Sequence, residues 1–426
     1  MKIAIAGYGI EGRQNLQYFR QRYPQAEIVI ADQRPVHDAP DDVMVLSGDD
    51  VFATQLHDVD LVVRTASLPP HDIQTTGDVW SATNEFFAMC PAPIIGVTGT
   101  KGKGTTCSFI ASILRAAGKT VYLVGNIGTP ALSVLPEIQP DDVVVYELSS
   151  FQLWDIQRSP QVAVILMIEP DHLDKHRDFA EYCRAKANIV RYQQADDTVV
   201  YNQQNQYSRD IATQSQAHHV TYPGNVADDI LDAIVLPGRH NRDNASAAVA
   251  AVRALDPAVS DDELRQGLAA FTGLPHRLKF VAEKDHVKYY DDSISTTPGS
   301  AIAAMRAFDQ PKVLILGGSD KGVDYTKLAR ELAQSSSLRA AVVAGGNAET
   351  VIVALRQAGV AESAIIHQTV ARMSDIVRTA MSAAQPGDVV VLSPAAASFD
   401  HYTNYADRGE QFVAAVMTME RMEEIT

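Results

Sequence analysis

Short apolar runs alternate with polar, helix-like stretches along the chain. Near the N-terminus, Ile3–Ala6, Ile28–Ala31 and Leu61–Val63 predict strands, and Gln14–Tyr23 predicts a helix. Comparable strand-like runs follow at Ile94–Val97, Val143–Tyr146, Val162–Ile168, Val313–Leu316, Ala340–Ala344 and Val389–Leu392. Short strands separated by helical segments are typical of doubly wound α/β folds. The pattern therefore predicts an α/β protein.

The chain is too long for one ordinary core. Its 426 residues suggest three domains, at about 150 residues per domain. Prolines interrupt regular structure in Cys90-Pro91-Ala92-Pro93 and near Thr272-Gly273-Leu274-Pro275. We therefore expect a Rossmann-like domain at 1–92, a central phosphate-loop domain at 93–274 and a second Rossmann-like domain at 275–426.

The segment from Gly96 to Thr106, GVTGTKGKGTT, lies between a predicted strand and a predicted helix. Small residues there let backbone N–H groups converge on phosphate, and Lys103 can reach the terminal phosphates. The strict pattern would have a glycine at Val97 and a hydroxyl residue at Gly104, so Thr105 is the nearest candidate for a metal-facing hydroxyl. A plain glycine-rich turn is the alternative. The segment predicts a site that binds and cleaves ATP.

A second glycine-rich turn runs from Gly7 to Gly12 after the first predicted strand, and Asp32 closes the second strand about 20 residues later. This spacing fits a nucleotide diphosphate site, with the acid on a ribose hydroxyl. A nicotinamide-dependent oxidoreductase is the alternative from a different class, but it would leave the phosphate loop without a role.

Composition narrows the partners. The formal charge is −16, from 36 basic and 52 acidic residues, which argues against nucleic acid and anionic membranes as partners. The chain opens directly on a strand-like run and has no run of membrane-spanning length. Three scattered cysteines give neither a disulfide framework nor a zinc site. We expect a cytoplasmic monomer that acts on small molecules.

In the central domain, polar residues directly follow three predicted strands: the phosphate loop, then Glu147, then His172. Parallel strands end at one edge of a sheet, so these groups can meet there. Glu147 suits Mg²⁺, although it could also be a helix N-terminal acid, and His172 could equally be a cap or a surface residue. Lys186, in the helical run Phe179–Tyr192, looks like part of a solvated face.

Several longer strings, taken in order, resemble the Mur ligases. They are Gly125-Asn126-Ile127-Gly128, Glu147-Leu148-Ser149-Ser150-Phe151-Gln152-Leu153, Asp171-His172-Leu173-Asp174, Gly238-Arg239-His240-Asn241, Gly273-Leu274-Pro275-His276-Arg277 and Leu392-Ser393-Pro394-Ala395. The resemblance covers all three predicted domains. It implies that ATP phosphorylates the free carboxylate of UDP-N-acetylmuramoyl-L-alanine, and that the amine of D-glutamate attacks the acyl phosphate, in cytoplasmic peptidoglycan synthesis.

The resemblance also implies roles for individual residues. The catalytic set would be Lys103, His172 and Lys186, with Lys186 carbamylated, and the magnesium ligands would be Thr105, Glu147, His172 and Lys186. ATP would contact Gly99, Thr100, Lys101, Gly102, Lys103, Gly104, Thr105, Asn241, Asn244, His276, Arg277 and Asp292. The UDP substrate would contact Gly9, Ile10, Glu11, Gln33, Arg34 and Asn126, and the acceptor amino acid would contact Thr296, Lys321, Ser398 and Tyr405.

The chain departs from the family at five places. Lys101-Gly102-Lys103-Gly104-Thr105 is closer to the phosphate loop of folylpolyglutamate synthases, and Ile294 stands where many members have a lysine. Glu11 and Gln33 stand where threonines are usual, and Arg64-Thr65-Ala66-Ser67 where Ser-Pro-Gly is common. Three alternatives remain. The ligase could use another acceptor, such as L-glutamate. The chain could instead be a folylpolyglutamate-type ligase or a non-catalytic nucleotide switch.

Overall fold

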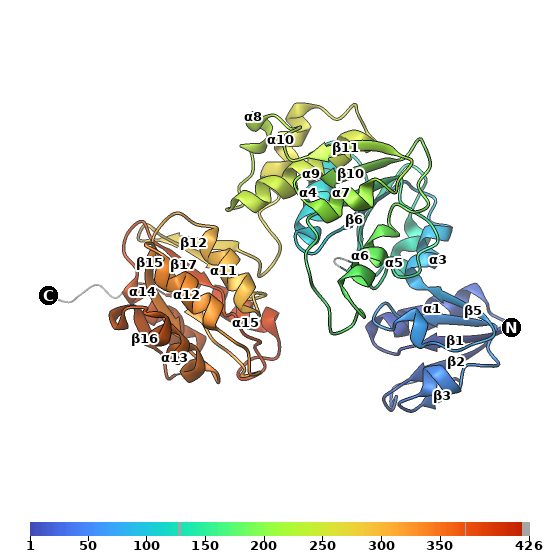
Figure 1. Ribbon diagram of the computed structural model, residues 1–426, viewed down its shortest axis with the longest axis horizontal. Coiled ribbons are helices and arrows are strands. Elements are labelled where there is room, and N and C mark those ends of the chain that lie inside the picture. Colours follow the sequence, from blue (N-terminus) through green and yellow to red (C-terminus); the bar gives the residue numbers. More distant parts are fainter. Residues whose placement is uncertain (127–128, 371, 420–426) are drawn as a thin grey trace. The chain divides into compact units, whose positions relative to one another are not determined.

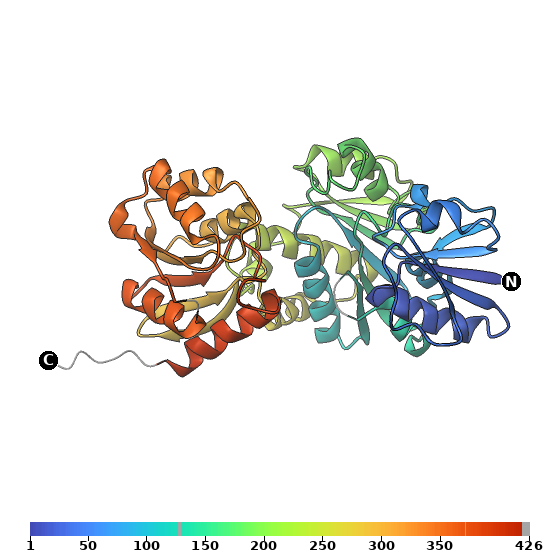
Figure 2. The ribbon, with the colours of Figure 1, turned by 90° about the horizontal axis from the view of Figure 1, so that it is seen from below.

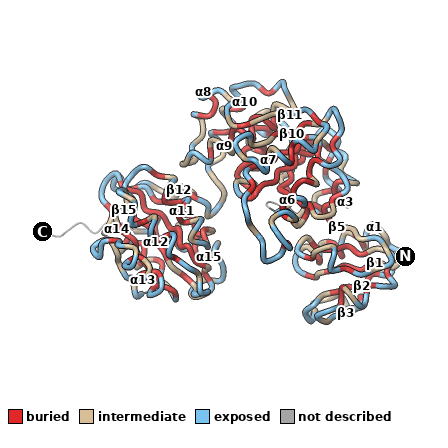
Figure 3. The backbone as a smooth tube through the Cα atoms, in the orientation of Figure 1, coloured by how far each residue is buried: buried red, intermediate tan, exposed pale blue. Residues whose placement is uncertain are grey.

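The computed structural model describes residues 1–126, 129–370 and 372–419. In these residues the chain forms three sheets, each flanked by helices (Figures 1 and 2). The predicted α/β fold is confirmed. Buried residues follow the strands of each sheet, and exposed ones follow the loops and outer helix faces (Figure 3). Ile127 and Gly128 of the quoted motif lie outside the described residues.

The first sheet is parallel, in the order β3-β2-β1-β4-β5. Its strands are β1 (Lys2–Ala6), β2 (Glu27–Asp32), β3 (Met44–Ser47), β4 (Leu61–Arg64) and β5 (Asp78–Ser81), and its helices are α1 (Ile10–Arg22), α2 (Val51–Thr54), the short 3₁₀ helix η1 (Pro70–Asp72) and α3 (Ala82–Met89). The connections diverge between β1 and β4, which is where doubly wound sheets place a ligand.

The second sheet is also parallel, in the order β11-β10-β9-β6-β8-β7. Its strands are β6 (Ile94–Thr98), β7 (Val121–Gly125), β8 (Val143–Glu147), β9 (Val162–Ile165), β10 (Thr198–Asn202) and β11 (His218–Tyr222). Its helices are α4 (Lys103–Ala116), α5 (Ala131–Val134), η2 (Leu135–Glu137), α6 (Phe179–Ala187), α7 (Gln206–Ala212), α8 (Asp228–Leu231), α9 (Arg239–Leu255) and α10 (Asp261–Ala270). Strand β6, which leads into the phosphate loop, lies between β8 and β9.

The third sheet has the order β12-β13-β17-β14-β15-β16, with β12 antiparallel to β13 and the other pairs parallel. Its strands are β12 (Lys279–Lys284), β13 (Val287–Asp291), β14 (Lys312–Leu316), β15 (Leu338–Val343), β16 (Ile365–His367) and β17 (Val389–Leu392). Its helices are α11 (Pro298–Arg306), α12 (Thr326–Gln334), α13 (Ala348–Ala358), η3 (Glu362–Ala364), α14 (Met373–Ala383) and α15 (Tyr405–Thr418).

The chain divides into two compact units, residues 1–234 with 240–271 and residues 235–239 with 272–426. The first unit holds both the first and the second sheet, and one apolar core runs through both, for example where Phe86 and Phe87 pack on Tyr146. The three-domain division therefore stays a prediction.

Two predicted elements are shorter than expected. Strand β9 ends at Ile165 instead of Ile168, because the next residues bond the phosphate loop. Leu166 N donates to Thr98 O, and Met167 O accepts from Thr100 N. Helix α6 ends at Ala187 instead of Tyr192, because the next N–H groups bond carbonyls three residues back. Apolar periodicity continues through both segments and so did not mark these ends.

Candidate active site

The phosphate loop joins β6 to α4 through two glycines with positive φ, Gly99 at 150° and Gly102 at 86°. A Cβ at Gly102 would lie 2.4 Å from Asn244 Oδ1, and one at Gly99 would lie 2.6 Å from Leu166 Cβ. Only glycine suits both positions. The loop is thus held against α9 and the segment after β9, with the N-terminus of α4 at its end, which is the arrangement that binds phosphate.

Lys103 is the first residue of α4, and its Nζ donates to the carbonyls of Gly99 and Thr100, at 3.1 Å each. The ammonium therefore lies over the loop that would hold the phosphates. Gly104 and Thr105 follow in the first turn of α4 and are buried.

The loop after β9 is tied to the phosphate loop. Thr100 Oγ1 lies 2.9 Å from the hydroxyl of Tyr182 and accepts from Glu169 N at 3.0 Å. Lys101, which is largely exposed, pairs with Asp171 at 3.6 Å. The loops that follow β6 and β9 therefore contact each other directly, as the sequence predicts for parallel strands that end at one edge of the sheet.

Lys186 is almost fully buried, although its sequence pattern suggested a solvated face. Its Nζ donates to Gly99 O at 2.9 Å and lies 4.7 Å from the centre of the Tyr182 ring. Burial lowers the pKa of Lys186 well below its usual value, and the neighbouring positive charge of Lys103 lowers it further. This environment favours the neutral amine at the phosphate loop.

Glu147 is the last residue of β8 and is buried. Its Oε1 accepts from Asn126 Nδ2 at 3.2 Å, and Asn126 N bonds the Glu147 carbonyl at 3.1 Å. The predicted muramoyl contact and the predicted magnesium ligand therefore lie side by side at the ends of β7 and β8. The negative charge of Glu147 also acts on Lys186.

His172 is exposed, has a φ of 54° and lies against the ring of Phe151, with 5.0 Å between ring centres. Sequence reasoning did not single out His176, which is buried four residues later. His176 Nε2 lies 2.9 Å from Ser150 Oγ, and burial lowers the pKa of this imidazole. The string that follows Glu147 is thereby held against the loop that carries His172. A second histidine in a polar loop gives no signal in the sequence pattern.

The fit to Mg²⁺ can be tested on these residues. Within the described ranges there is no group of three or more His, Cys, Asp or Glu side chains that could hold a metal ion. Mg²⁺ bound through nucleotide phosphates needs only one or two protein carboxylates, and Glu147 supplies one beside the phosphate loop. The residues therefore fit a metal that arrives with ATP.

The predicted adenine contacts lie on α9. Asn244 Nδ2 donates to Asn241 Oδ1 at 3.4 Å, and Asn244 Oδ1 faces Gly102. Both asparagines are thus near the phosphate loop, and their contact with adenine stays a prediction.

A pocket of about 590 Å³ opens at the carboxyl ends of β1, β2 and β4. Its lining includes the predicted UDP contacts Gly9, Ile10, Glu11, Gln33 and Arg34. Ile10 is 78% exposed, so an apolar side chain is available to a ligand there.

Two of the acids that line this pocket, Asp32 and Glu11, are engaged by backbone. The carboxylate of Asp32 accepts from Tyr8 N at 2.7 Å and from Arg34 N at 2.9 Å, and Glu11 accepts from Ala66 N at 2.9 Å. Glu11 places a carboxylate in the first turn of α1.

The predicted acceptor contacts follow the parallel strands β13, β17 and β14, which are neighbours in the third sheet. Thr296 is half-buried, Ser398 is buried, and Lys321 Nζ lies 5.2 Å from the centre of the exposed Phe399 ring. Tyr405 begins α15, and its backbone carbonyl accepts from Ser293 Oγ at 2.7 Å. These loops share one edge of the sheet.

The predicted nucleotide contacts of the second unit are near β13. His276 Nδ1 lies 2.7 Å from the buried Asp291 Oδ2, and Arg277 is exposed. Asp292 is buried and accepts from Ser393 Oγ at 2.9 Å and Leu278 N at 3.2 Å. Burial raises the pKa of Asp292 to about 7. In this structure Asp292 holds the segment after His276 to β17.

Sequence reasoning also missed Arg408. This buried guanidinium donates to Ser293 O at 2.8 Å and to Ala396 O at 3.1 Å, which joins the loops after β13 and β17. Its position in an ordinary helical run gave no signal.

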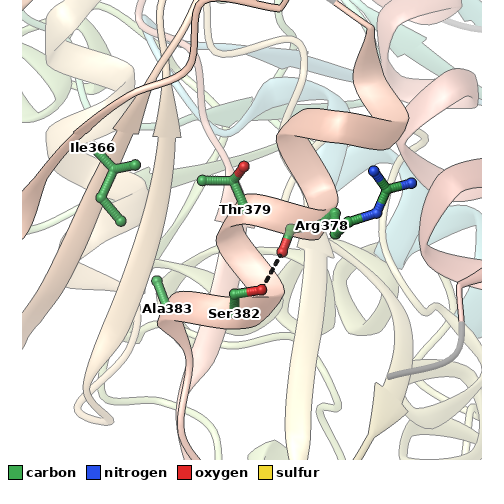
Figure 4. A pocket seen from close by; sticks show the side chains of 5 residues that line it. All are labelled: Ile366, Arg378, Thr379, Ser382 and Ala383. Carbon is green, nitrogen blue, oxygen red and sulfur yellow. Dashed lines mark hydrogen bonds between the residues drawn. The ribbon is translucent and has the colours of Figure 1, made fainter. Parts of the chain in front are cut away.

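A hollow of about 370 Å³ lined by residues of β16 and α14 holds none of the predicted site residues (Figure 4). Its lining side chains, drawn there, are Ile366, Arg378, Thr379, Ser382 and Ala383.

No helix in the described part of the chain is both long and apolar enough to cross a membrane.

Comparison with known proteins gives two family matches. The Mur ligase middle domain matches residues 97–232, and the Mur ligase glutamate ligase domain matches residues 276–396. A relative from Symbiobacterium thermophilum, named UDP-N-acetylmuramoylalanine--D-glutamate ligase, is 37% identical over 86% of this chain and 85% of its own. A relative of the same name from Salinibacter ruber is 38% identical over 85% of each chain.

Solved structures show the same fold. MurF from Acinetobacter baumannii has a TM-score of 0.60 at 22% identity, covering 84% of this chain and 85% of that one. A folylpolyglutamate synthase from Mycobacterium tuberculosis has a TM-score of 0.57 at 17% identity, covering 80% of this chain and 94% of that one. The family matches and the two relatives agree with the phosphate loop and the site around it, and the chain belongs to the Mur ligase family.

Proposed function

We propose that the protein is the ATP-dependent ligase that joins D-glutamate to UDP-N-acetylmuramoyl-L-alanine in peptidoglycan synthesis. The observation that carries the proposal is the meeting of the phosphate loop, Lys103, Lys186 and Glu147 at one edge of the second sheet. The relatives' names support the choice of substrates.

In the first step, the substrate carboxylate attacks the γ-phosphorus, and the bond to ADP breaks. The N-terminus of α4 and the Lys103 ammonium, which lies over the loop, would face the phosphates and stabilise the charge that develops. Mg²⁺, when bound, would neutralise the phosphate oxygens, with Glu147, His172 and Thr105 as its proposed ligands.

In the second step, the acceptor amine attacks the acyl phosphate, and the tetrahedral intermediate expels phosphate. We assign the acceptor carboxylates to Lys321, Ser398, Thr296 and Tyr405. An ammonium with hydroxyl donors is suited to a carboxylate.

We further propose that Lys186 is carbamylated. Its neutral nitrogen can attack CO₂ and release a proton, which turns the side chain into an anion beside Lys103. Burial favours this modification because the free amine, not the ammonium, is the nucleophile. The carbamate would add an oxygen ligand next to the phosphates, where the unmodified chain offers Glu147.

A folylpolyglutamate-type ligase is the second candidate, favoured by the Lys101 to Thr105 string. The pocket in the first sheet argues for a UDP substrate, because a folate ligase has no evident use for it.

One assay tests the proposal. Phosphate release is measured with ATP and Mg²⁺, with either UDP-N-acetylmuramoyl-L-alanine or a folate as the carboxylate substrate, and with D-glutamate, L-glutamate or other amino acids side by side. We expect release with D-glutamate alone. Release with L-glutamate would reassign the acceptor, and release only with a folate substrate would overturn the proposal. We also propose that the enzyme is a cytoplasmic monomer. Light scattering, which measures the molar mass in solution, tests the oligomeric state.

A further inference from the structure

Glu11 and the Arg64-Thr65-Ala66-Ser67 string meet in the structure. Glu11 and Ala66 lie 55 residues apart in sequence, yet the side chains of Glu11 and Arg64 both bond residues 65–68, the loop that follows β4. Thr65, Ser67 and Leu68 of this loop line the pocket of the first sheet. The inference below rests on the proposed UDP-substrate role of that pocket.

Arg64 holds the loop from one side. Its side chain is fully buried, and its Nη1 donates to the carbonyls of Thr65, Ala66 and Leu68, at 3.3, 3.4 and 3.1 Å. The loop therefore wraps around the guanidinium, and three of its carbonyls are fixed by one rigid group.

The rest of the guanidinium is fixed to the second sheet's side of the unit. Arg64 Nε donates to Asp155 Oδ2 at 2.7 Å, and Nη2 bonds Asp155 Oδ1 and, at 3.1 Å, Phe151 O. Asp155 is itself anchored, because its carbonyl accepts from Asn84 Nδ2 at 3.0 Å. Through Arg64, the pocket loop is thus tied to the segment that begins at Glu147.

Glu11 holds the loop from the other side, through Ala66 N. Burial raises the pKa of Glu11, and the positive charge of Arg64 opposes that rise, so the two charges act across the loop. The loop in turn supports the glycine turn, because a Cβ at Gly7 would lie 2.3 Å from Thr65 Oγ1. A shift of the loop would therefore change the pocket wall.

We propose that Glu11 and Arg64 act together as positioning residues that hold residues 65–68 as the wall of the UDP-substrate pocket. Glu11 then serves the ligand through Ala66 and not by direct contact. The carboxylate of Glu11 and the guanidinium of Arg64 thus support one loop from its two sides.

The experiment is a double-mutant cycle read by calorimetric binding of UDP, which needs no turnover. Glu11→Ala and Arg64→Lys should each weaken UDP binding by about tenfold. The double variant should bind UDP no more weakly than the worse of the two single variants, because both substitutions release the same loop. Glu11→Gln should stay within about threefold of wild type, since its amide oxygen can still accept from Ala66 N. The KM for ATP should not change in the Glu11 variants.

A matched control is Arg20→Gln, on the same helix as Glu11, which breaks the exposed ion pair between Arg20 and Asp42 and leaves the pocket lining intact. If Arg64→Lys does not fold, Asp155→Asn takes its place in the cycle. Effects that multiply to about a hundredfold, or Glu11→Gln binding as weakly as Glu11→Ala, would overturn the proposal and indicate direct contact. Ligase turnover without UDP binding would overturn it while leaving the proposed function intact.

Discussion

Lys186 donates a hydrogen bond of 2.9 Å from its Nζ to the carbonyl oxygen of Gly99, which lies 87 residues earlier in the chain. This contact brings a buried amine to the phosphate loop and within the electrostatic reach of Lys103 and Glu147. A lysine in this position is costly to keep charged, so its presence is better explained by chemistry than by stability.

Replacement of Lys186 should therefore impair the reaction more than the fold. We expect Lys186→Ala to lower kcat by at least about 100-fold, as does the loss of other groups that stabilise charge at a reacting centre. Short-chain carboxylates added to the assay should restore part of the activity by standing in for the carbamate. Lys186→Met, which keeps most of the volume, should melt at or above the wild-type temperature. An active, unrescued Lys186→Ala enzyme would exclude the carbamate.

Lys103 should be needed for the phosphoryl step alone. Lys103→Ala is expected to abolish phosphate release, because it removes the ammonium that lies over the phosphate loop. Calorimetric binding of UDP should be unchanged, since the pocket of the first sheet does not include Lys103. Normal turnover in this variant would remove Lys103 from the mechanism.

A side chain at Gly102 should weaken ATP binding. Gly102→Ala would place a Cβ 2.4 Å from Asn244 Oδ1 at a φ of 86°, so the Asn244 side chain or the loop must shift and the KM for ATP should rise. Gly118→Ala is the matched control, because its φ is 76° but nothing lies within 4 Å of the new Cβ. Both variants should lose about 1–2 kcal/mol of stability to the left-handed backbone, and only Gly102→Ala should bind ATP poorly. Equal KM values for ATP in the two variants would contradict this.

Asp292 should make the second unit less stable as the pH rises. Its pKa of about 7 lies above the usual 3.8, so between these values the folded protein holds a proton that the unfolded chain has released. The free energy of unfolding therefore falls through this window, by up to about 4 kcal/mol for a shift of this size. Above pH 7 the loss is complete.

Denaturant unfolding of Asp292→Asn between pH 4 and 8 checks this. We expect the variant to lose that part of the slope, because an amide does not titrate. Asp309→Asn, at an exposed position of the same unit, should keep the wild-type slope. Parallel pH profiles for wild type and Asp292→Asn would show that Asp292 does not hold the proton.

The sequence by itself determined the α/β class, three strands in each of the three sheets to within a few residues, and the phosphate loop. These features follow from local rules: short apolar runs form strands, and glycines between a strand and a helix form a loop that can bind phosphate. The common edge for the phosphate loop and Glu147 also followed, since parallel strands end on one side of a sheet.

Only the tertiary structure decided what is buried and what meets at long range. Lys186 lies on a helical run whose pattern suggested solvent, yet it is buried with its Nζ against the phosphate loop. The contacts from Arg64 to Asp155 and from His276 to Asp291 join segments that no local pattern relates. A side chain's surroundings are set by the packing of distant elements, and hydrophobic periodicity records only which face of its own element turns inward.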